Sequence, residues 1–321
     1  MYKKIAFLAP IYPPHYQFAR DLLASHHKHN LHEQSDIWIV FTDETEKESF
    51  GDYLFTIVLP KELRIFNNHG IINIKKFYGL KQIQEKYPYI IVLDAESLFI
   101  RNVNLFAICE EYFTSKILLG NEVFPERKEA IEGVKNSCKR FFADNKNVEK
   151  LNNPLYLWFN QPCIYKASNL NDFWNKIDYD HNIKSLQWAD FDYYIYMFYL
   201  VLFQGFSIVD MDIETNCGIC EASEGSLSLF KSNKYETLPI FMASQAVLHI
   251  FDNPKCFIAI HLDRNKDWML RVMSQKIDYC IQKIRDLENK QKRARLIPLF
   301  RKLLACFIPS KKLRHKIRGK N

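Results

Sequence analysis

The part of this 321-residue sequence that says most about its architecture reads Tyr89-Ile90-Ile91-Val92-Leu93-Asp94-Ala95-Glu96. Its first five residues are apolar or aromatic, which is the continuous pattern of a strand buried on both faces of a parallel sheet. Two carboxylates follow at once, separated by a single alanine. In open α/β sheets, ligands bind beyond the carboxyl ends of the strands. The stretch therefore predicts a central strand with a ligand site at its end.

Further strands and helices extend outward from this stretch. Apolar, strand-like runs cover 5–9, 37–41 and 53–59, and helical spacing covers 16–25 and 71–86. Strands separated by helices of such length indicate βαβ units and a mostly parallel sheet flanked by helices. The second half is more mixed, with strands expected at 117–119, 162–165, 206–209 and 257–261 and helices at 169–178, 188–204 and 267–290. The predicted class is α/β, built around one domain.

The charge of the chain is unevenly distributed. The net charge is +7, from 44 Lys and Arg against 37 Asp and Glu. Residues 291–321 contain eleven of these basic residues and no acid, so residues 1–290 hold 33 basic and 37 acidic groups. A mildly acidic body with a basic tail does not predict nucleic-acid binding, and we expect no nucleic-acid partner. The domain boundary is accordingly predicted between 290 and 291.

Several features predict a cytoplasmic location. The apolar run after Lys3 and Lys4 stops at Pro10, which is too short for the core of a signal peptide. No uninterrupted apolar stretch reaches the roughly 18 residues of a membrane-spanning helix. The eight cysteines are scattered, which is typical of free thiols in a reducing compartment.

The carboxylates of Asp94 and Glu96 are suited to one hard cation. Placed at i and i+2 beyond a strand, both can approach Mg²⁺ or Mn²⁺, which proteins often hold with one or two carboxylates and substrate phosphates. Such a metal offsets the charge that grows on a nucleoside diphosphate leaving group. The alternative is that the two acids only cap the turn that follows.

A family resemblance enters at these residues. Lys75-Lys76-Phe77-Tyr78-Gly79-Leu80, followed by the stretch 89–100 with its Asp94-Ala95-Glu96, resembles the D-x-D region of GT-A glycosyltransferases, above all those of bacterial lipooligosaccharide and capsule synthesis. Two later stretches resemble the same family more loosely, Asp190-Phe191-Asp192 and the segment from His261 through Lys266 to Trp268. Glu96 departs from the family's second Asp, and Phe191 replaces its Gln, so the resemblance leaves the stereochemical outcome open.

The resemblance implies a fold and a set of roles. It implies a single Rossmann-like GT-A domain over 1–290, with Asp94, Glu96 and His261 as ligands of Mn²⁺ or Mg²⁺. It places Lys266 on the diphosphate and Lys76 among the donor-binding residues. Asp190 and Asp192 would be the catalytic carboxylates that face the transferred sugar or the acceptor.

Other residues fit the same site from their positions. Tyr12 follows the first strand, where this fold places its nucleotide base, and could stack on it or simply pack in the loop. Asn160 and Gln161 offer amide groups suited to a bound donor, or a turn before a strand. His261 ends a strand, and a structural histidine would fit the pattern too. Lys266 could likewise lie solvated at a helix start.

Three weaker signals do not support a different chemistry. The C-x-x-C pair at Cys217 and Cys220 has no partner pair nearby, so redox or zinc chemistry is not expected. His26, His27, His29 and His32 cluster in a polar stretch that we interpret as a solvated loop. No phosphate-binding glycine motif is present, which argues against an ATPase or a dehydrogenase with a Rossmann fingerprint.

The C-terminal stretch predicts membrane attachment. Apolar residues from Leu296 to Ile308 recur at helical spacing, between Lys and Arg residues. Such a basic amphipathic helix is suited to an anionic membrane surface, which we expect residues 296–320 to contact. Packing against the protein's own body is the alternative.

The predicted function is metal-dependent transfer of a sugar from a nucleotide sugar, with a UDP-sugar as the expected donor, to a lipid-linked saccharide. The enzyme would work as a peripheral protein on the inner face of the cytoplasmic membrane. Two rivals stay open. One is a sugar nucleotidyltransferase, and the other is a catalytically silent saccharide-binding or scaffold protein at the membrane.

Overall fold

A computed structural model of the chain describes residues 4–64, 70–99, 102–120, 128–155, 157, 163–210 and 259–261. All of them belong to one compact unit, which spans Met1–Arg264. The predicted helices at 267–290 and 296–308 lie outside the described residues, as does the predicted tail at 291–321. The boundary at 290 and 291 therefore stays a prediction.

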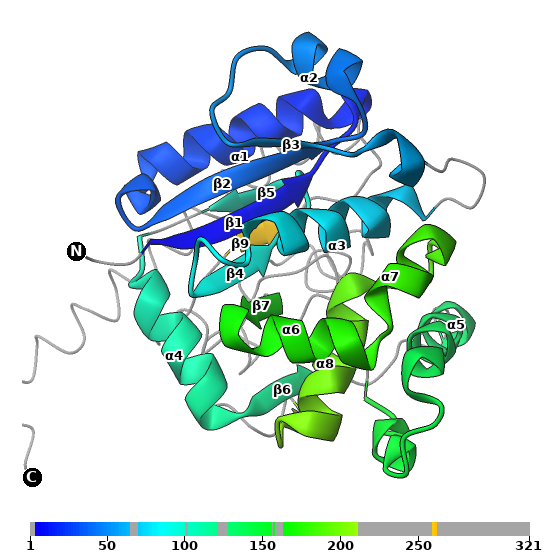
Figure 1. The fold of residues 1–321 in the computed structure, drawn as a ribbon. Helices are drawn as coiled ribbons and strands as arrows, with labels where there is room; N and C mark the ends of the chain where they lie inside the picture. Colours follow the sequence, from blue (N-terminus) through cyan, green and yellow to red (C-terminus); the bar gives the residue numbers. More distant parts are fainter. Residues whose placement is uncertain are drawn as a thin grey trace, which may run out of the picture. The chain divides into compact units, whose positions relative to one another are not determined.

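A five-stranded sheet forms the centre of this unit (Figure 1), with the strand order β3-β2-β1-β4-β7. β1 runs parallel to β2 and β4, and β2 runs parallel to β3, while β7 runs antiparallel to β4. The α/β class and the mostly parallel sheet flanked by helices are thereby confirmed. The strands are β1 (Ile5–Pro10), β2 (Ser35–Phe41), β3 (Thr56–Val58), β4 (Tyr89–Val92) and β7 (Cys163–Lys166).

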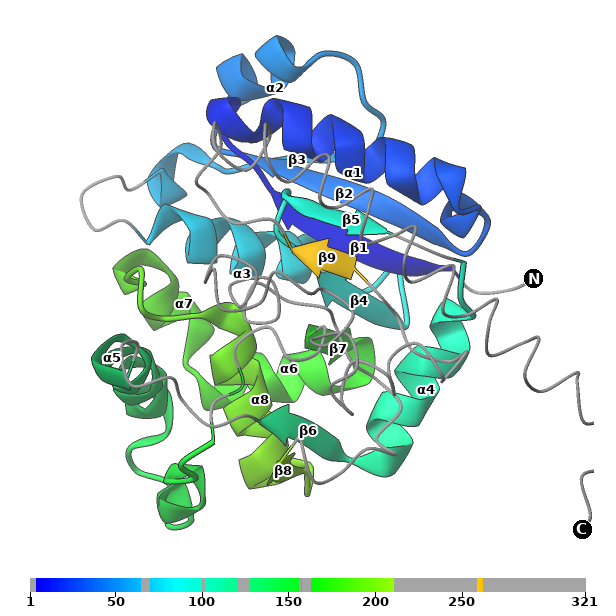
Figure 2. The same ribbon diagram turned by 180° about the vertical axis from the view of Figure 1, so that it is seen from behind.

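Helices cover both faces of the central strand β1. Successive side chains of a strand point to opposite faces. The Phe7 ring packs against His26 of α1 (Tyr16–Lys28) and against Phe99, at centroid distances of 6.0 and 4.9 Å. The next residue, Leu8, lies against Gly79 of α3 (Ile71–Ile83). Figure 1 is seen from the side of α3, and Figure 2 from the side of β5 and β9.

Two helices of the second half complete the core. α6 (Ala167–Lys176) follows β7, and α8 (Asp192–Phe203) is buried from Asp192 to Leu200. A helix that is apolar all round belongs in a protein interior. Two of its tyrosines accept hydrogen bonds from backbone amides: Tyr194 from Leu157 N and Tyr196 from Lys166 N.

Two short sheets flank the main one. β5 (Ser97–Phe99) pairs antiparallel with β9 (Ala259–His261), and β6 (Ile117–Gly120) pairs parallel with β8 (Ser207–Asp210). The remaining α-helices described are α2 (Glu44–Phe50), α4 (Leu105–Ser115), α5 (Lys128–Lys139) and α7 (Tyr179–Asn182). Within the described ranges, no helix is both long and apolar enough to cross a bilayer.

Some local predictions were wrong. The strand expected at 53–59 spans only Thr56–Val58, and the helix expected from 188 begins at Asp192. The histidine stretch is not a solvated loop, because α1 continues through Lys28 and buries His26. The imidazole Nε2 of His26 lies 2.7 Å from Ser35 Oγ, and burial lowers the pKa of His26 to about 4.

Candidate active site at the carboxyl ends of β1 and β4

The strand order reverses between β1 and β4, and we call the carboxyl edge of these two strands the crevice. From β1 the chain builds β2 and β3 on one side, and it later returns to add β4 on the other. Such a reversal of strand order is the topological switch point where open α/β sheets bind ligands. Tyr12 follows β1, and Asp94 and Glu96 follow β4, so three of the residues predicted for the site lie at this edge.

Lys76 of α3 brings two of the predicted carboxylates together. Its Nζ lies 3.0 Å from Asp94 Oδ1 and 3.2 Å from Asp192 Oδ1. The side chains of Lys76 and Asp192 are buried, whereas that of Asp94 is 20% exposed. Burial by itself would lower the pKa of Lys76, but the two carboxylates outweigh it and raise that pKa. An ammonium ion is thus held between two carboxylates at the crevice.

Asp192 stands in the first turn of α8, where a negative charge interacts favourably with the helix dipole. Its Oδ2 accepts a 2.7 Å hydrogen bond from the hydroxyl of Tyr165 on β7. Its Oδ1 has the Lys76 ammonium at ion-pair distance but no partner in hydrogen-bond geometry among the described residues. Asp192 therefore has one oxygen fixed by the fold and one facing the cationic cluster.

Glu96 has a partner that the sequence did not indicate. His15 Nδ1 lies 3.2 Å from Glu96 Oε2, and both side chains are buried. The Tyr12 ring lies over the imidazole at a centroid distance of 4.0 Å, and Tyr12 itself is 39% exposed. Sequence reasoning missed His15, and its only signal was its position five residues after β1.

The first turns of α3 hold the loops around the crevice. Lys75 Nζ donates to the backbone carbonyl of Ile11, 2.5 Å away, and lies 3.1 Å from Glu46 Oε2. Burial lowers the pKa of Lys75, and Glu46 partly opposes that shift. Asn73 Nδ2 donates to the carbonyls of Gln187 and Trp188. With Lys76, one helix thus ties together the loop after β1, the loop after β4 and the loop before α8.

Asp190 has a different set of partners from Asp192. Its carboxylate accepts hydrogen bonds from the hydroxyl of Ser137, the guanidinium of Arg140 and the backbone amide of Gln187. It is fully buried, and its bond to Gln187 closes the loop that carries it. These contacts fix the backbone just before α8, so a structural role accounts for Asp190.

The remaining predicted residues are described only in part. His261 ends β9, and the β5–β9 register pairs it with Ser97, the residue after Glu96. The backbone therefore brings position 261 beside the Asp94–Glu96 turn. Three further predicted residues, Asn160, Gln161 and Lys266, lie outside the described residues, as do Cys217 and Cys220.

The carboxylate oxygens at the crevice are chemically suited to bind a hard divalent cation. Carboxylate oxygens such as those of Asp94 and Glu96 are the ligands that Mg²⁺ and Mn²⁺ prefer. Within the described residues, however, no three His, Cys, Asp or Glu side chains converge closely enough to hold a metal. In this arrangement Lys76 pairs with Asp94, and His15 with Glu96. A bound cation would compete with those two groups for the same carboxylates.

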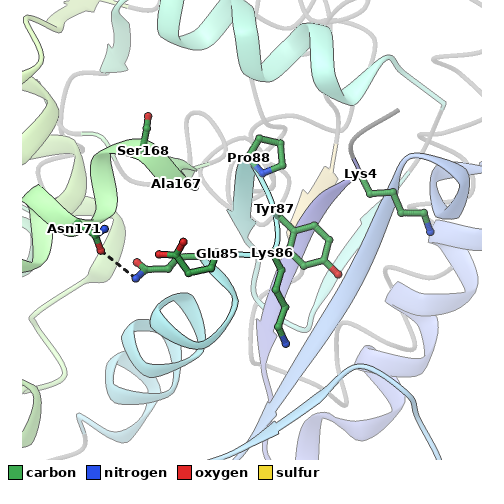
Figure 3. A pocket seen from close by; sticks show the side chains of 9 residues that line it. Lys4, Glu85, Lys86, Tyr87, Pro88, Ala167, Ser168 and Asn171 are labelled. Atoms are coloured by element: carbon green, nitrogen blue, oxygen red, sulfur yellow. Dashed lines mark hydrogen bonds between the residues drawn. The ribbon is translucent and has the colours of Figure 1, made fainter. Parts of the chain in front are cut away.

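A cavity of about 460 Å³ lies elsewhere on the molecule (Figure 3). It is lined by Lys4 just before β1, Pro88 just before β4, and Ser168 and Asn171 of α6, among others. It therefore opens at the amino ends of β1 and β4, opposite the carboxyl ends where this fold class binds ligands. None of the predicted site residues lines it.

Comparison with solved structures finds a crystal structure of the galactosyltransferase LgtC in complex with donor and acceptor sugar analogs. It is 12% identical in sequence, covers 89% of this chain and 95% of that chain, and has a TM-score of 0.42. A structure of an active-site mutant of LgtC has the same identity and coverage, with a TM-score of 0.41. No protein-family model and no curated protein matches the chain. Likeness at this level assigns it no activity.

Proposed function

We propose that this chain is a GT-A-type glycosyltransferase that moves a sugar from a nucleotide sugar, with a UDP-sugar as the expected donor, to a lipid-linked saccharide. The observation that carries this proposal is the cluster of Lys76, Asp94 and Asp192 at the switch point of the sheet. Burying charged groups is costly, and strongly perturbed ionisable groups cluster at functional sites.

Each group at the crevice has a role in sugar transfer. The exposed ring of Tyr12 is suited to stack on the base of the nucleotide. Asp94 and Glu96 would hold Mn²⁺ or Mg²⁺, which stabilises the negative charge on a departing diphosphate when it is bound. Lys76 keeps a positive charge beside Asp94, and Asp192 turns one oxygen toward it. Preorganised charge of this kind stabilises the transition state without reorganisation.

Four further residues complete the proposal, of which only His261 lies in the described ranges. Lys266 is assigned to the diphosphate, Asn160 and Gln161 to the donor, and His261 to the metal beside Glu96. The antiparallel pairing of β5 with β9 supports the last assignment, because it sets His261 opposite Ser97.

The rival enzyme class is less compatible with the first loop. A sugar nucleotidyltransferase needs a glycine-rich loop whose amides cradle phosphates after the first strand. Residues 9–14 read Ala-Pro-Ile-Tyr-Pro-Pro, which contains no glycine and three residues without an amide hydrogen. We therefore favour transfer of the sugar over activation of the sugar.

The deciding experiment measures thermal unfolding of the full chain with Mn²⁺ or Mg²⁺ and a panel of nucleoside diphosphates. A ligand that binds only the folded state should stabilise it by about 2.7 kcal/mol at 100 times its dissociation constant. We expect one diphosphate to stabilise the wild type only with metal present. Asp94→Asn and Glu96→Gln should lose that shift, whereas Asp180→Asn, which changes an exposed carboxylate, should keep it.

The same experiment separates the transferase from the silent alternative. If no diphosphate stabilises the chain with either metal, the transferase proposal is wrong and the saccharide-binding or scaffold alternative is favoured. Where a diphosphate does bind, its sugar conjugate should release it faster when a saccharide acceptor is added.

Membrane attachment through residues 296–320 is proposed on the sequence alone. Each Lys or Arg near an anionic surface contributes about 1 kcal/mol, and salt screens that attraction. We expect the full chain to sediment with vesicles that contain phosphatidylglycerol and to leave them at high salt. Replacing Lys311, Lys312 and Arg314 by Gln should weaken this binding, and equal binding to purely phosphatidylcholine vesicles would contradict it.

A further inference from the structure

His15 carries an unused hydrogen-bonding atom at the crevice. The residue is 4% exposed, and its Nε2 is buried without a hydrogen-bond partner among the described residues. Leaving a buried polar atom unpaired is unfavourable, and native structures rarely do so without a reason. The atom belongs to a short helical turn directly after β1, on the β1 side of the crevice between β1 and β4.

Glu96 determines which ligand groups Nε2 can meet. An ionised carboxylate only accepts hydrogen bonds, so Nδ1, 3.2 Å from Glu96 Oε2, carries the proton. In a neutral imidazole this leaves Nε2 as an acceptor, and in a protonated one Nε2 becomes a donor. A hydroxyl group can both donate and accept, so it pairs with either form. A phosphate oxygen or a base carbonyl only accepts, and it would leave the neutral imidazole unpaired.

The surroundings of His15 indicate where that hydroxyl comes from. The Tyr12 ring, which we propose as the platform for the base, lies over the imidazole at a centroid distance of 4.0 Å. The imidazole also contacts Glu96, which is one of the proposed metal ligands near the diphosphate. His15 therefore stands between the group assigned to the base and the group assigned to the metal and diphosphate. In a nucleotide, the sugar between the base and the diphosphate is the ribose.

We propose that His15 Nε2 forms a hydrogen bond with a ribose hydroxyl of the bound nucleotide, so that the site selects ribonucleotides over deoxyribonucleotides. Glu96 then has two roles, since it orients His15 and would also help to hold the metal. Tyr12 lies over His15 and is 39% exposed, so a base stacked on its ring would lie on the same side of the crevice as His15. This inference rests on the proposed function, because it requires a nucleotide in the crevice.

The test compares the binding of UDP, 2′-deoxy-UDP and 3′-deoxy-UDP to the full chain by calorimetry with Mn²⁺. A site that hydrogen-bonds a hydroxyl disfavours the analogue that lacks it. Losing a hydrogen bond while a buried partner stays unpaired weakens binding by roughly 5- to 100-fold. We expect the wild type to bind one of the two deoxy analogues at least about 10-fold more weakly than UDP.

Two substitutions of His15 separate its two nitrogens. In His15→Asn the amide replaces Nδ1, which keeps a donor for Glu96 and removes Nε2. In His15→Gln the amide replaces Nε2 and removes the contact to Glu96. We expect His15→Asn to bind UDP and the deoxy analogue equally, and His15→Gln to retain part of the discrimination.

The outcomes of this test are distinct. If the wild type binds UDP and both deoxy analogues equally, or if His15→Asn keeps the full discrimination, the role of His15 is overturned while the transferase proposal stands. If no nucleoside diphosphate binds the wild type, both proposals fail together. The comparison within the wild type decides the question even if a variant does not fold.

Discussion

The Lys76 ammonium lies 3.0 Å from Asp94 Oδ1, so the first carboxylate of the predicted metal-binding pair already faces a cation supplied by the chain itself. The same ammonium lies 3.2 Å from Asp192, which stands on a different helix. Lys76 is therefore both part of the candidate site and a link between β4 and α8. A change at this residue should affect folding stability as well as activity.

Replacing Lys76 by Met should destabilise the fold strongly. The change leaves the buried Asp192 and the partly buried Asp94 without their cation, and breaking a buried ion pair from one side costs about 3–5 kcal/mol. Urea denaturation measures the loss. Lys81→Met is the matched control, because Lys81 lies on the same helix and pairs with the exposed Asp180. Adding Asp192→Asn to Lys76→Met should recover part of the stability, and strict additivity would contradict the proposed pairing.

Asp190 and Asp192 should respond differently to the same substitution. Asp190→Asn should lower the free energy of unfolding by about 1–3 kcal/mol, because it disturbs the bonds to Ser137, Arg140 and the Gln187 amide. Asp192→Asn should lower the rate of sugar transfer by about 100-fold or more, as expected when a preorganised charge is removed from a site. Denaturation and single-turnover assays of both variants distinguish these effects. A large loss of rate in Asp190→Asn at unchanged stability would instead make Asp190 the catalytic carboxylate.

Gly79 should not tolerate a side chain. A Cβ atom there would lie 2.9 Å from Leu8 Cδ1 and 2.9 Å from Val40 Cγ2, both in the sheet core. We expect Gly79→Ala to destabilise the protein by roughly 1–3 kcal/mol, since overpacking outweighs the gain in helix propensity. At Gly133 of α5, a Cβ atom would meet no described atom within 4 Å, so Gly133→Ala should stabilise by up to about 1 kcal/mol. Opposite signs in thermal unfolding would confirm how closely α3 packs on β1.

The buried His26 should make the protein sensitive to acid. Its pKa in the fold is about 4 because burial disfavours the charged form, whereas the unfolded value is near 6.5. Between these two values the unfolded state binds the proton and the folded state does not, so stability falls as the pH drops from about 6.5 toward 4. The difference corresponds to about 3 kcal/mol. His26→Gln should flatten this part of the stability curve, while His181→Gln, which changes an exposed histidine that does not act on His26, should leave it steep.

The positions of the buried strands could be predicted from their apolar runs. β4 lies between β1 and β7 in the sheet, and its residues are buried on both faces. The run before Asp94 is therefore continuously apolar, and this pattern is visible in the sequence. The direction of β7 could not be predicted, because a short apolar strand reads alike in either orientation. The burial of His26 also escaped prediction, because it depends on Phe7 and Ser35 packing around it.

The candidate site could be predicted where polar, chemically active side chains come directly after a strand in the sequence. Asp94 and Glu96 were found in this way, and the crevice at the end of β4 is where the fold places them. His15 was missed because its meaning comes from Glu96, far along the chain, and no local pattern marks that pairing. Asp190 and Asp192 look equivalent in the sequence, and only their partners Arg140 and Lys76 distinguish them.

The ties made by α3 also determine when the site can form during folding. Asn73 and Gln187, which hydrogen-bond to one another, are 114 residues apart in the chain. Closing so long a loop is entropically costly and tends to occur late, after local helices and hairpins have formed. The β1–β4 core can assemble as synthesis proceeds, but the Lys76–Asp192 pair must wait until α8 has emerged from the ribosome. The crevice is thus completed last, and a correctly joined ion pair there reports that both halves of the unit have docked.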